Sequence, residues 1–195
     1  ITHLGYPLFF KENFIHKIYG NYPANYQIQT TACRGVQKGC SKSLAIVNEV
    51  LYYKARSGVC AYDGSLPTES SYVLGNEVYS NAVGGAYGNK YYISMQDMNG
   101  EWQLFVYDTQ TKLWYREDNT EVASWGWNRE LYYMDAAGRV WVTGNVREVP
   151  EGSTPEGIVE SMVEFADFVE ANPNKKGTSR FQLRIDLEEG AEVAV

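Results

Sequence analysis

The sequence has few of the residues on which catalytic and metal sites usually depend. Among 195 residues it contains only two histidines and three cysteines, and no Cys-x-x-Cys pair. Neither a disulfide framework nor a structural zinc site is therefore expected, and we predict that Cys33, Cys40 and Cys60 are unpaired thiols. The sequence also lacks an acidic calcium loop and a phosphate-binding glycine loop, so we predict no metal and no cofactor.

Basic residues and long apolar runs are scarce as well. Lys and Arg together number 17 against 24 Asp and Glu, which gives a formal net charge of −7. Nucleic-acid binding needs a basic surplus or a basic patch, so we predict no nucleic-acid partner. No run of about 18 apolar residues occurs, and no signal peptide or membrane-inserted segment is predicted. Because the chain begins at Ile1 rather than Met, we expect a processed or excised piece.

Aromatic residues are abundant, and they are unevenly distributed. The 16 Tyr, 5 Trp and 18 Gly favour strands and turns, which predicts an all-β fold. Every Tyr and Trp lies at or before Trp141, whereas residues 146–195 carry a net charge of −6. We therefore predict a boundary between Asn145 and Pro155, with one part over 1–150 and another over 151–195.

A repeat fills the first part. Each copy has a short strand, a turn at Asn and a Tyr-Tyr strand, followed by a Gly-containing turn and further strands. The Tyr pairs begin at Tyr52, Tyr91 and Tyr132, which are 39 and 41 residues apart. A fainter copy, at a constant offset of 44, places Leu8-Phe9 on Tyr52-Tyr53. The last strand of the copy that contains Tyr52 is predicted at Ser70 to Leu74.

A period near 40 with four short strands per copy is typical of a β-propeller blade. We therefore predict a partial or small β-propeller of about four antiparallel, four-stranded blades over 1–150. A β-sandwich is the alternative, since it also contains many short strands.

The C-terminal part follows a different pattern. Residues 158–169 fit both a helix and a strand, because Ile158, Met162, Phe165 and Val169 fall at helical spacing. Residues 180–188 alternate strictly and predict a strand with Phe181, Leu183, Ile185 and Leu187 on one face. The chain ends within an apparent strand, so we expect this part to be truncated.

Two resemblances add to this interpretation. The segment from Leu104 to Trp114, with Tyr107-Asp108-Thr109, resembles a Kelch-type blade. Residues 40–195 resemble phage and prophage tail-type structural proteins of Gram-positive bacteria, through Met162–Phe168, Asn174–Gly177 and Arg180–Ala191. That resemblance implies a propeller-like array followed by a β-sandwich segment, with a strand at 159–169. It also implies a virion protein that is present in the bacterial cytoplasm before assembly. Its expected partners are other virion proteins or a host-surface glycan, and the chain is expected to be able to form an oligomer.

Catalytic motifs are absent from the sequence. His16 lies among apolar residues without a partner motif, and we interpret it as structural. Four candidate carboxylates of a glycosidase, Asp63, Asp97, Asp108 and Asp135, each fall in a repeated turn. We therefore predict no catalytic residues and a non-enzymatic structural or host-surface recognition module. A glycan-binding propeller lectin is the alternative, and a glycan-cleaving enzyme ranks third.

The candidate binding residues are aromatic. Tyr and Trp suit adaptable binding surfaces, where they would line a face or a central opening. The candidates are Tyr52, Tyr91, Tyr132, Trp125 and Trp127. Their positions in strands favour the other interpretation, in which they pack between blades.

Overall fold

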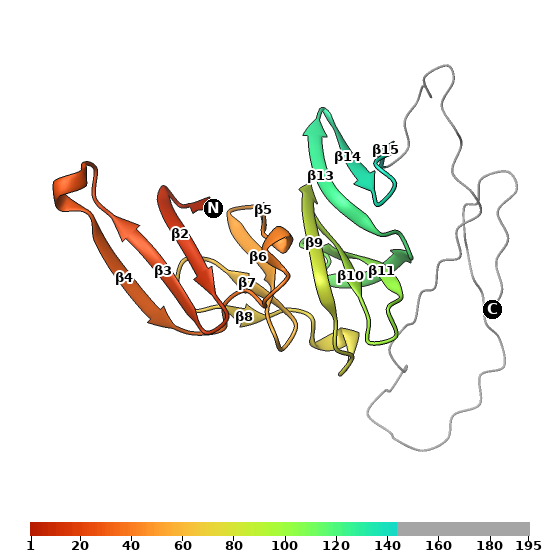
Figure 1. The fold of residues 1–195 in the computed structure, drawn as a ribbon, viewed down its shortest axis with the longest axis horizontal. Helices are drawn as coiled ribbons and strands as arrows, with labels where there is room; N and C mark the ends of the chain where they lie inside the picture. Colours follow the sequence, from red (N-terminus) through yellow and green to blue (C-terminus); the bar gives the residue numbers. More distant parts are fainter. Residues whose placement is uncertain (144–195) are drawn as a thin grey trace, which may run out of the picture. The chain divides into compact units, whose positions relative to one another are not determined.

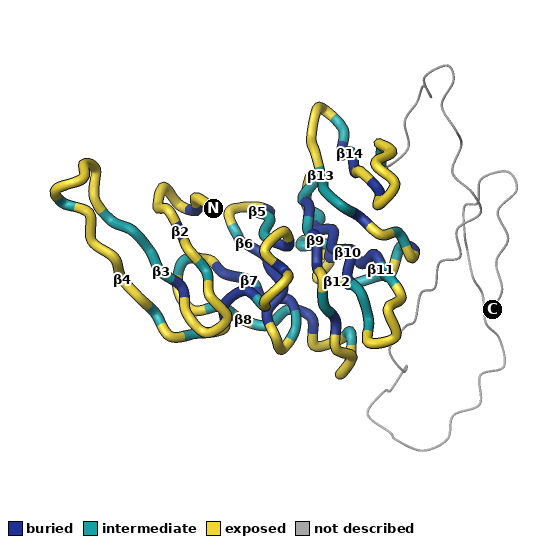
Figure 2. The backbone as a smooth tube through the Cα atoms, viewed as in Figure 1, coloured by how far each residue is buried: buried dark blue, intermediate teal, exposed yellow. Residues whose placement is uncertain are grey.

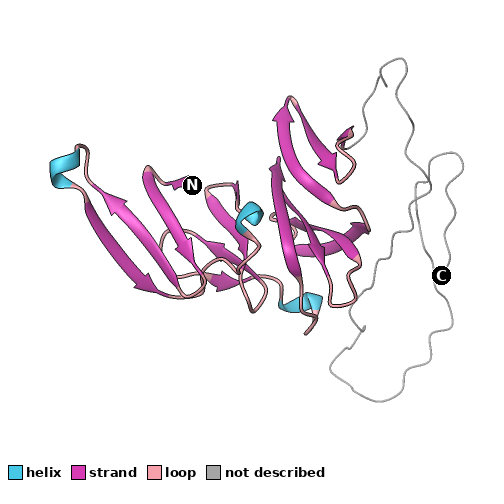
Figure 3. Ribbon diagram, in the orientation of Figure 1, coloured by secondary structure: helices cyan, strands magenta, loops and turns pink. Residues whose placement is uncertain are grey.

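In the computed structural model of the 195-residue chain, residues 1–143 are described. The predictions for 151–195 lie outside these residues, as does the predicted boundary. Over 1–143 the chain is all-β, as predicted, and its helical segments are three single 3₁₀ turns (Figure 3). These turns are η1 (Pro23–Asn25), η2 (Ser41–Ser43) and η3 (Tyr72–Leu74). No helix in this range is long and apolar enough to cross a membrane.

The strands form four separate antiparallel sheets, each from consecutive strands (Figure 1). Sheet 1 contains β1 (Thr2–His3), β2 (Tyr6–Lys11), β3 (Phe14–Tyr19) and β4 (Gln27–Ala32). Sheet 2 contains β5 (Ala45–Val47), β6 (Val50–Lys54), β7 (Val59–Tyr62) and β8 (Thr68–Glu69). Sheet 3 contains β9 (Ser80–Tyr87), β10 (Lys90–Gln96), β11 (Trp102–Asp108) and β12 (Leu113–Asp118). Sheet 4 contains β13 (Val122–Asn128), β14 (Glu130–Asp135) and β15 (Val140–Val142).

The strand predicted at Ser70 to Leu74 is wrong. Strand β8 ends at Glu69, and Tyr72–Leu74 form η3. The reason is a side-chain hydrogen bond: Ser71 Oγ accepts the backbone N–H of Val59 at 2.7 Å, so this N–H is paired without a further strand residue. The backbone N–H of Leu74 then bonds the Ser71 carbonyl at 2.9 Å, which closes the 3₁₀ turn.

The Tyr pairs lie on the second strand of sheets 2, 3 and 4, so the prediction of equivalent strands is confirmed. The predicted alignment of individual residues is wrong by one position in sheet 3. The true equivalents lie opposite a small residue of the first strand. These pairs are Tyr52 with Ala45, Tyr92 with Gly85, and Tyr132 with Gly126. The structural repeat therefore relates Tyr52, Tyr92 and Tyr132 at a uniform spacing of 40 residues.

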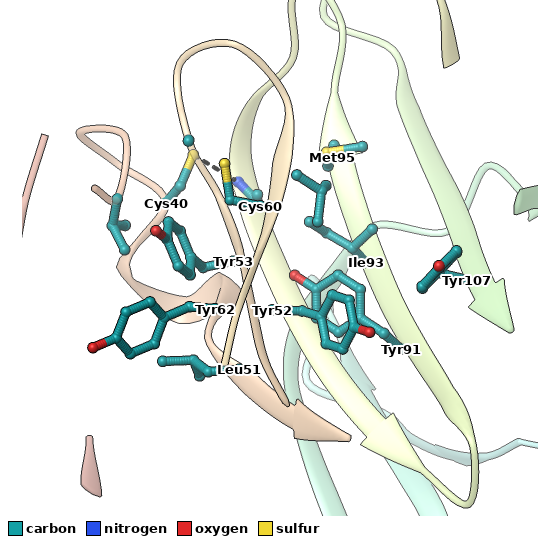
Figure 4. Packing of buried hydrophobic residues seen from close by; sticks show 14 of the residues in the cluster. Cys40, Leu51, Tyr52, Tyr53, Cys60, Tyr62, Tyr91, Ile93, Met95 and Tyr107 are labelled. Atoms are coloured by element: carbon teal, nitrogen blue, oxygen red, sulfur yellow. Dashed lines mark hydrogen bonds between the residues drawn. The ribbon is translucent and has the colours of Figure 1, made fainter. Parts of the chain in front are cut away.

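The shift has its origin in the first hairpin of each sheet. The turn of sheet 2 is Asn48-Glu49, whereas that of sheet 3 is Gly88-Asn89, so the asparagines occupy different turn positions. Because side chains alternate between the two faces of a strand, a shift of one residue moves a side chain to the other face. Tyr91 therefore points toward sheet 2, where its ring stacks on Tyr52 at a centroid distance of 5.3 Å (Figure 4).

Successive sheets pack through these faces. We call the face of a sheet that points to the next sheet along the chain its forward face, and the opposite face its rear face. Tyr52 and Tyr92 lie on forward faces. Across the three junctions the ring centroids lie 5.0 Å apart for Phe10 and Tyr53, 5.3 Å for Tyr52 and Tyr91, and 5.5 Å for Tyr92 and Trp125. The large aromatic side chains therefore form the core between sheets, and β6, β10 and β11 are largely buried (Figure 2).

Candidate functional site

The first hairpin turns of sheets 2, 3 and 4 enclose a shallow depression of about 670 Å³, which we call the turn depression. It is lined by Ile46, Val47, Asn48, Ala86, Tyr87, Gly88, Trp127 and Arg129. Ile46, Ala86 and Trp127 occupy equivalent positions, since each pairs with the second residue of the following strand. Residues at the same strand position in three sheets therefore lie on one surface of the protein.

Trp127 is the most exposed aromatic side chain of this depression. It lies near the end of β13, opposite the buried Leu131, and its side chain is 70% exposed. A large apolar ring in water is costly unless something covers it, so such a ring at the rim of a depression is typical of a binding surface.

Asparagine side chains organise the polar part of the depression. Asn48 Nδ2 donates to Asn89 Oδ1 at 3.0 Å and to Thr109 Oγ1 at 3.1 Å, so one amide joins the turns of sheets 2 and 3. Asn48 also adopts the left-handed backbone conformation at φ 47°, which asparagine tolerates better than most residues. These contacts hold the amide in one orientation beside the apolar lining.

Tyr87 and Arg129 supply further polar groups. The Tyr87 hydroxyl donates to the Arg129 carbonyl and lies 3.2 Å from Glu130 Oε2. The negative charge of Glu130 raises the pKa of Tyr87, so the phenol remains protonated and a donor. The guanidinium of Arg129 forms no ion pair with residues 1–143, and the residue is exposed to water. The depression thus combines an exposed indole with a cation and hydrogen-bonding groups.

The five aromatic candidates from the sequence do not gather at one place. Tyr52 and Tyr91 are buried between sheets 2 and 3, and Tyr91 Oη donates to the Ser43 carbonyl at 2.7 Å. Burial raises the pKa of Tyr52 to about 12, and it also raises the pKa of Tyr91. Trp125 packs on Tyr92, and its indole N–H donates to the Val83 carbonyl at 3.2 Å. These three side chains therefore pack between neighbouring sheets, which is the role that their positions in strands favoured over ligand binding.

The remaining two candidates differ from each other. Trp127 lines the turn depression, whereas Tyr132 is half-buried on the forward face of sheet 4 and does not line it. The sequence interpretation missed Asn48, Tyr87 and Arg129. Aligning the copies on their turns rather than on their Tyr pairs would have placed these residues beside Trp127.

The candidate carboxylates are turn residues, as predicted. In each turn one carboxylate oxygen accepts a backbone N–H two or four residues further along the chain. The distances are 2.9 Å for Asp63 and Ser65, 2.8 Å for Asp97 and Asn99, 2.8 Å for Asp108 and Gln110, and 2.9 Å for Asp135 and Arg139.

Histidine and cysteine also lie where the sequence placed them. His16 is half-buried, and its Nδ1 lies 2.9 Å from Thr30 Oγ1. Cys33, Cys40 and Cys60 are free thiols, two of them buried. Within residues 1–143, no group of three or more His, Cys, Asp or Glu side chains is placed to hold a metal ion.

No protein-family model, curated protein or solved structure matches this chain. Inference about its function therefore rests on the geometry of the turn depression and on the sequence patterns.

Proposed function

We propose that residues 1–143 form part of a β-propeller whose blades are sheets 1 to 4. Three observations support this proposal. Each sheet consists of consecutive antiparallel strands, the sheets pack in chain order, and the first strands β5 and β13 both lie beside β9. Small residues at equivalent first-strand positions, Ala45, Gly85 and Gly126, suit the crowded centre of such an array.

We further propose that the protein is a non-enzymatic recognition module that binds a glycan at the turn depression. The exposed indole of Trp127 is the observation that carries this proposal. The C–H face of a sugar ring is apolar and stacks on an indole, while its hydroxyls need hydrogen-bonding groups at the rim. Asn48, Tyr87 and Arg129 supply such groups around Trp127.

The biological setting that we propose is a phage or prophage particle, in which the glycan belongs to the host surface and other partners are virion proteins. The support for this setting is the resemblance of residues 40–195 to tail-type proteins. The genes beside the coding sequence test it directly, because tail or capsid genes there would support it and their absence would contradict it.

The glycan proposal predicts a selective effect of Trp127→Ala. A glycan array identifies a bound sugar, and calorimetry then compares the wild type, Trp127→Ala and Tyr72→Ala. Tyr72 is a matched control, since it is an aromatic residue that is 76% exposed and does not line the depression. We expect Trp127→Ala to weaken binding at least about tenfold, while Tyr72→Ala leaves it unchanged.

Two results would contradict this function. One is an array on which the protein captures no glycan. The other is a captured glycan that Trp127→Ala binds as tightly as the wild type, which would place the site elsewhere. Hydrolysis of a bound glycan would instead contradict the non-enzymatic part of the proposal.

A further inference from the structure

Among residues 1–143, two sheet faces lack the neighbour that covers their equivalents. The rear faces of sheets 2, 3 and 4 bury Tyr53, Ile93 and Tyr133, which are 0%, 0% and 9% exposed. Their equivalent in sheet 1 is Phe9, one residue beyond Leu8 as Tyr53 is beyond Tyr52, and it is 57% exposed. The position that forms the core at three junctions is therefore in water on the rear face of sheet 1.

Two further exposed apolar residues lie on this rear face, beside the polar residues Lys11, His16 and Thr30. Phe14 and Ile28 point the same way as Phe9, because Phe9 pairs with His16, and Ile18 pairs with Ile28. Both are exposed, Ile28 by 66%. The outermost strand β4 is exposed over most of its length (Figure 2). Exposed large apolar side chains gathered on one sheet face are typical of an interaction surface.

The forward face of sheet 4 is the second uncovered face. Tyr132, Met134 and Val140 lie on it, since Met134 pairs with Val140, and Val140 is 69% exposed. Gly126 gives the clearest comparison. A Cβ at the equivalent Gly85 would come within 2.5 Å of the Trp125 ring from the next sheet, whereas a Cβ at Gly126 would meet nothing within 4 Å. No side chain of the described residues fills here the space that Trp125 fills at the junction of sheets 3 and 4.

We propose that these two faces bind each other between copies of the chain, so that sheet 4 of one copy packs its forward face on the rear face of sheet 1 of a second copy. A forward face packs on a rear face at all three junctions within the chain, and each uncovered face is the counterpart of the other. Two copies joined in this way at both ends contribute eight sheets, which is within the four to eight blades of known propellers. The second copy is thus the occupant that supplies both missing neighbours.

A complementation experiment tests this head-to-tail pairing in the 195-residue protein. Phe9→Asp places a charge on the rear face of sheet 1, and Val140→Lys places one on the forward face of sheet 4. Both positions are exposed in the single chain, so far-ultraviolet circular dichroism should remain that of the wild type. We expect sedimentation equilibrium to give a two-chain mass for the wild type and a one-chain mass for each variant. Met98→Lys, at an exposed turn away from both faces, should keep the two-chain mass.

Mixing the two variants then distinguishes head-to-tail from symmetric pairing. The mixture contains one intact pair of faces, the forward face of Phe9→Asp and the rear face of Val140→Lys, so we expect a two-chain species to return. A one-chain mass for the wild type well above micromolar concentration would overturn the proposal, and would show that another segment or partner covers these faces. A mixture that stays at the one-chain mass, or a Val140→Lys variant that keeps the two-chain mass, would overturn it too. These outcomes do not depend on glycan binding.

Discussion

Single residues set the distances between neighbouring sheets. Gly85 on β9 leaves room for the indole of Trp125, because a Cβ there would lie 2.5 Å from the ring. Small residues also lie opposite Tyr52 and Tyr132, namely Ala45 and Gly126, but a Cβ at Gly126 would meet nothing within 4 Å. The junction between sheets 3 and 4 consequently depends on one missing methyl group.

Gly85→Ala should therefore destabilise the protein. The added methyl group must displace Trp125, and overpacking of this kind costs about 1–3 kcal/mol. Gly126→Ala, at the equivalent position of sheet 4, is the control and should be close to neutral when measured at a dilution that keeps the chains apart. Urea unfolding followed by tryptophan fluorescence measures both. Equal stability of the two variants would argue against the packing described for Trp125.

The carboxylate of Asp135 makes stability depend on pH in the acid range. The Trp141 indole N–H donates to Oδ2 at 3.0 Å and, together with Arg139, lowers the pKa of Asp135 to about 2. An unfolded Asp titrates near about 3.9, so between these values the carboxyl group binds fewer protons in the folded state than in the unfolded state. The contribution to stability is complete above about pH 4, and it is lost as the pH falls toward about 2.

Trp141→Phe removes the main donor to this carboxylate. We expect the pKa of Asp135, followed by carboxyl NMR, to rise toward the ordinary value of about 3.9, and the loss of stability on acidification to begin at a higher pH. The introduced phenyl ring would keep the stacking that Trp141 makes on Tyr133. An unchanged pKa of Asp135 in this variant would show that the indole hydrogen bond is not its cause.

At the scale of the strands, a repeated donor-to-carbonyl bond joins neighbouring sheets. Tyr91 Oη donates to the Ser43 carbonyl, and Trp125 Nε1 donates to the Val83 carbonyl, 40 residues further along the chain. Two different side chains thus bond backbone carbonyls 40 residues apart, that of Ser43 in η2 before β5 and that of Val83 within β9. Sheet-to-sheet packing therefore includes directional bonds in addition to buried aromatic rings.

Tyr91→Phe isolates this directional part. It keeps the buried ring but removes the donor to the Ser43 carbonyl, and we expect a loss of about 1–3 kcal/mol. Tyr107→Phe is a matched control, because Tyr107 is also buried against Tyr52 and its hydroxyl forms no hydrogen bond among residues 1–143. Thermal unfolding should therefore rank Tyr91→Phe clearly below Tyr107→Phe, and the reverse order would be incompatible with the bond.

Strand positions could be predicted better than strand faces. Glycine and asparagine turns and alternating apolar residues located the Tyr pairs on the correct strands, since these signals are local. An alignment of the copies on their Tyr pairs misplaces Tyr91 by one residue, because the pair in sheet 3 is shifted relative to the turn that sets the register. The strand expected at Ser70 to Leu74 failed because a distant contact, Ser71 with Val59, replaced the ladder.

For the whole molecule, exposure depends on which sheets have neighbours. Trp125 and Trp127 are two residues apart and on the same face of β13, yet one packs on Tyr92 and the other lies in water. Sequence alone could not separate them, because both are aromatic residues in a strand. The composition did predict an all-β chain with an aromatic core. Only the packing of complete sheets determines which aromatic side chains are exposed and can contact a ligand.

The strictly sequential pairing of strands also has a consequence for synthesis. Every ladder among residues 1–143 joins strands that follow each other in the chain, so none of them requires a residue that is made much later. As the chain leaves the ribosome, sheet 1 can pair its strands before sheet 2 exists, and its forward face can then receive sheet 2. We therefore expect the sheets to pack in the order in which they are translated, each on the forward face of the sheet before it.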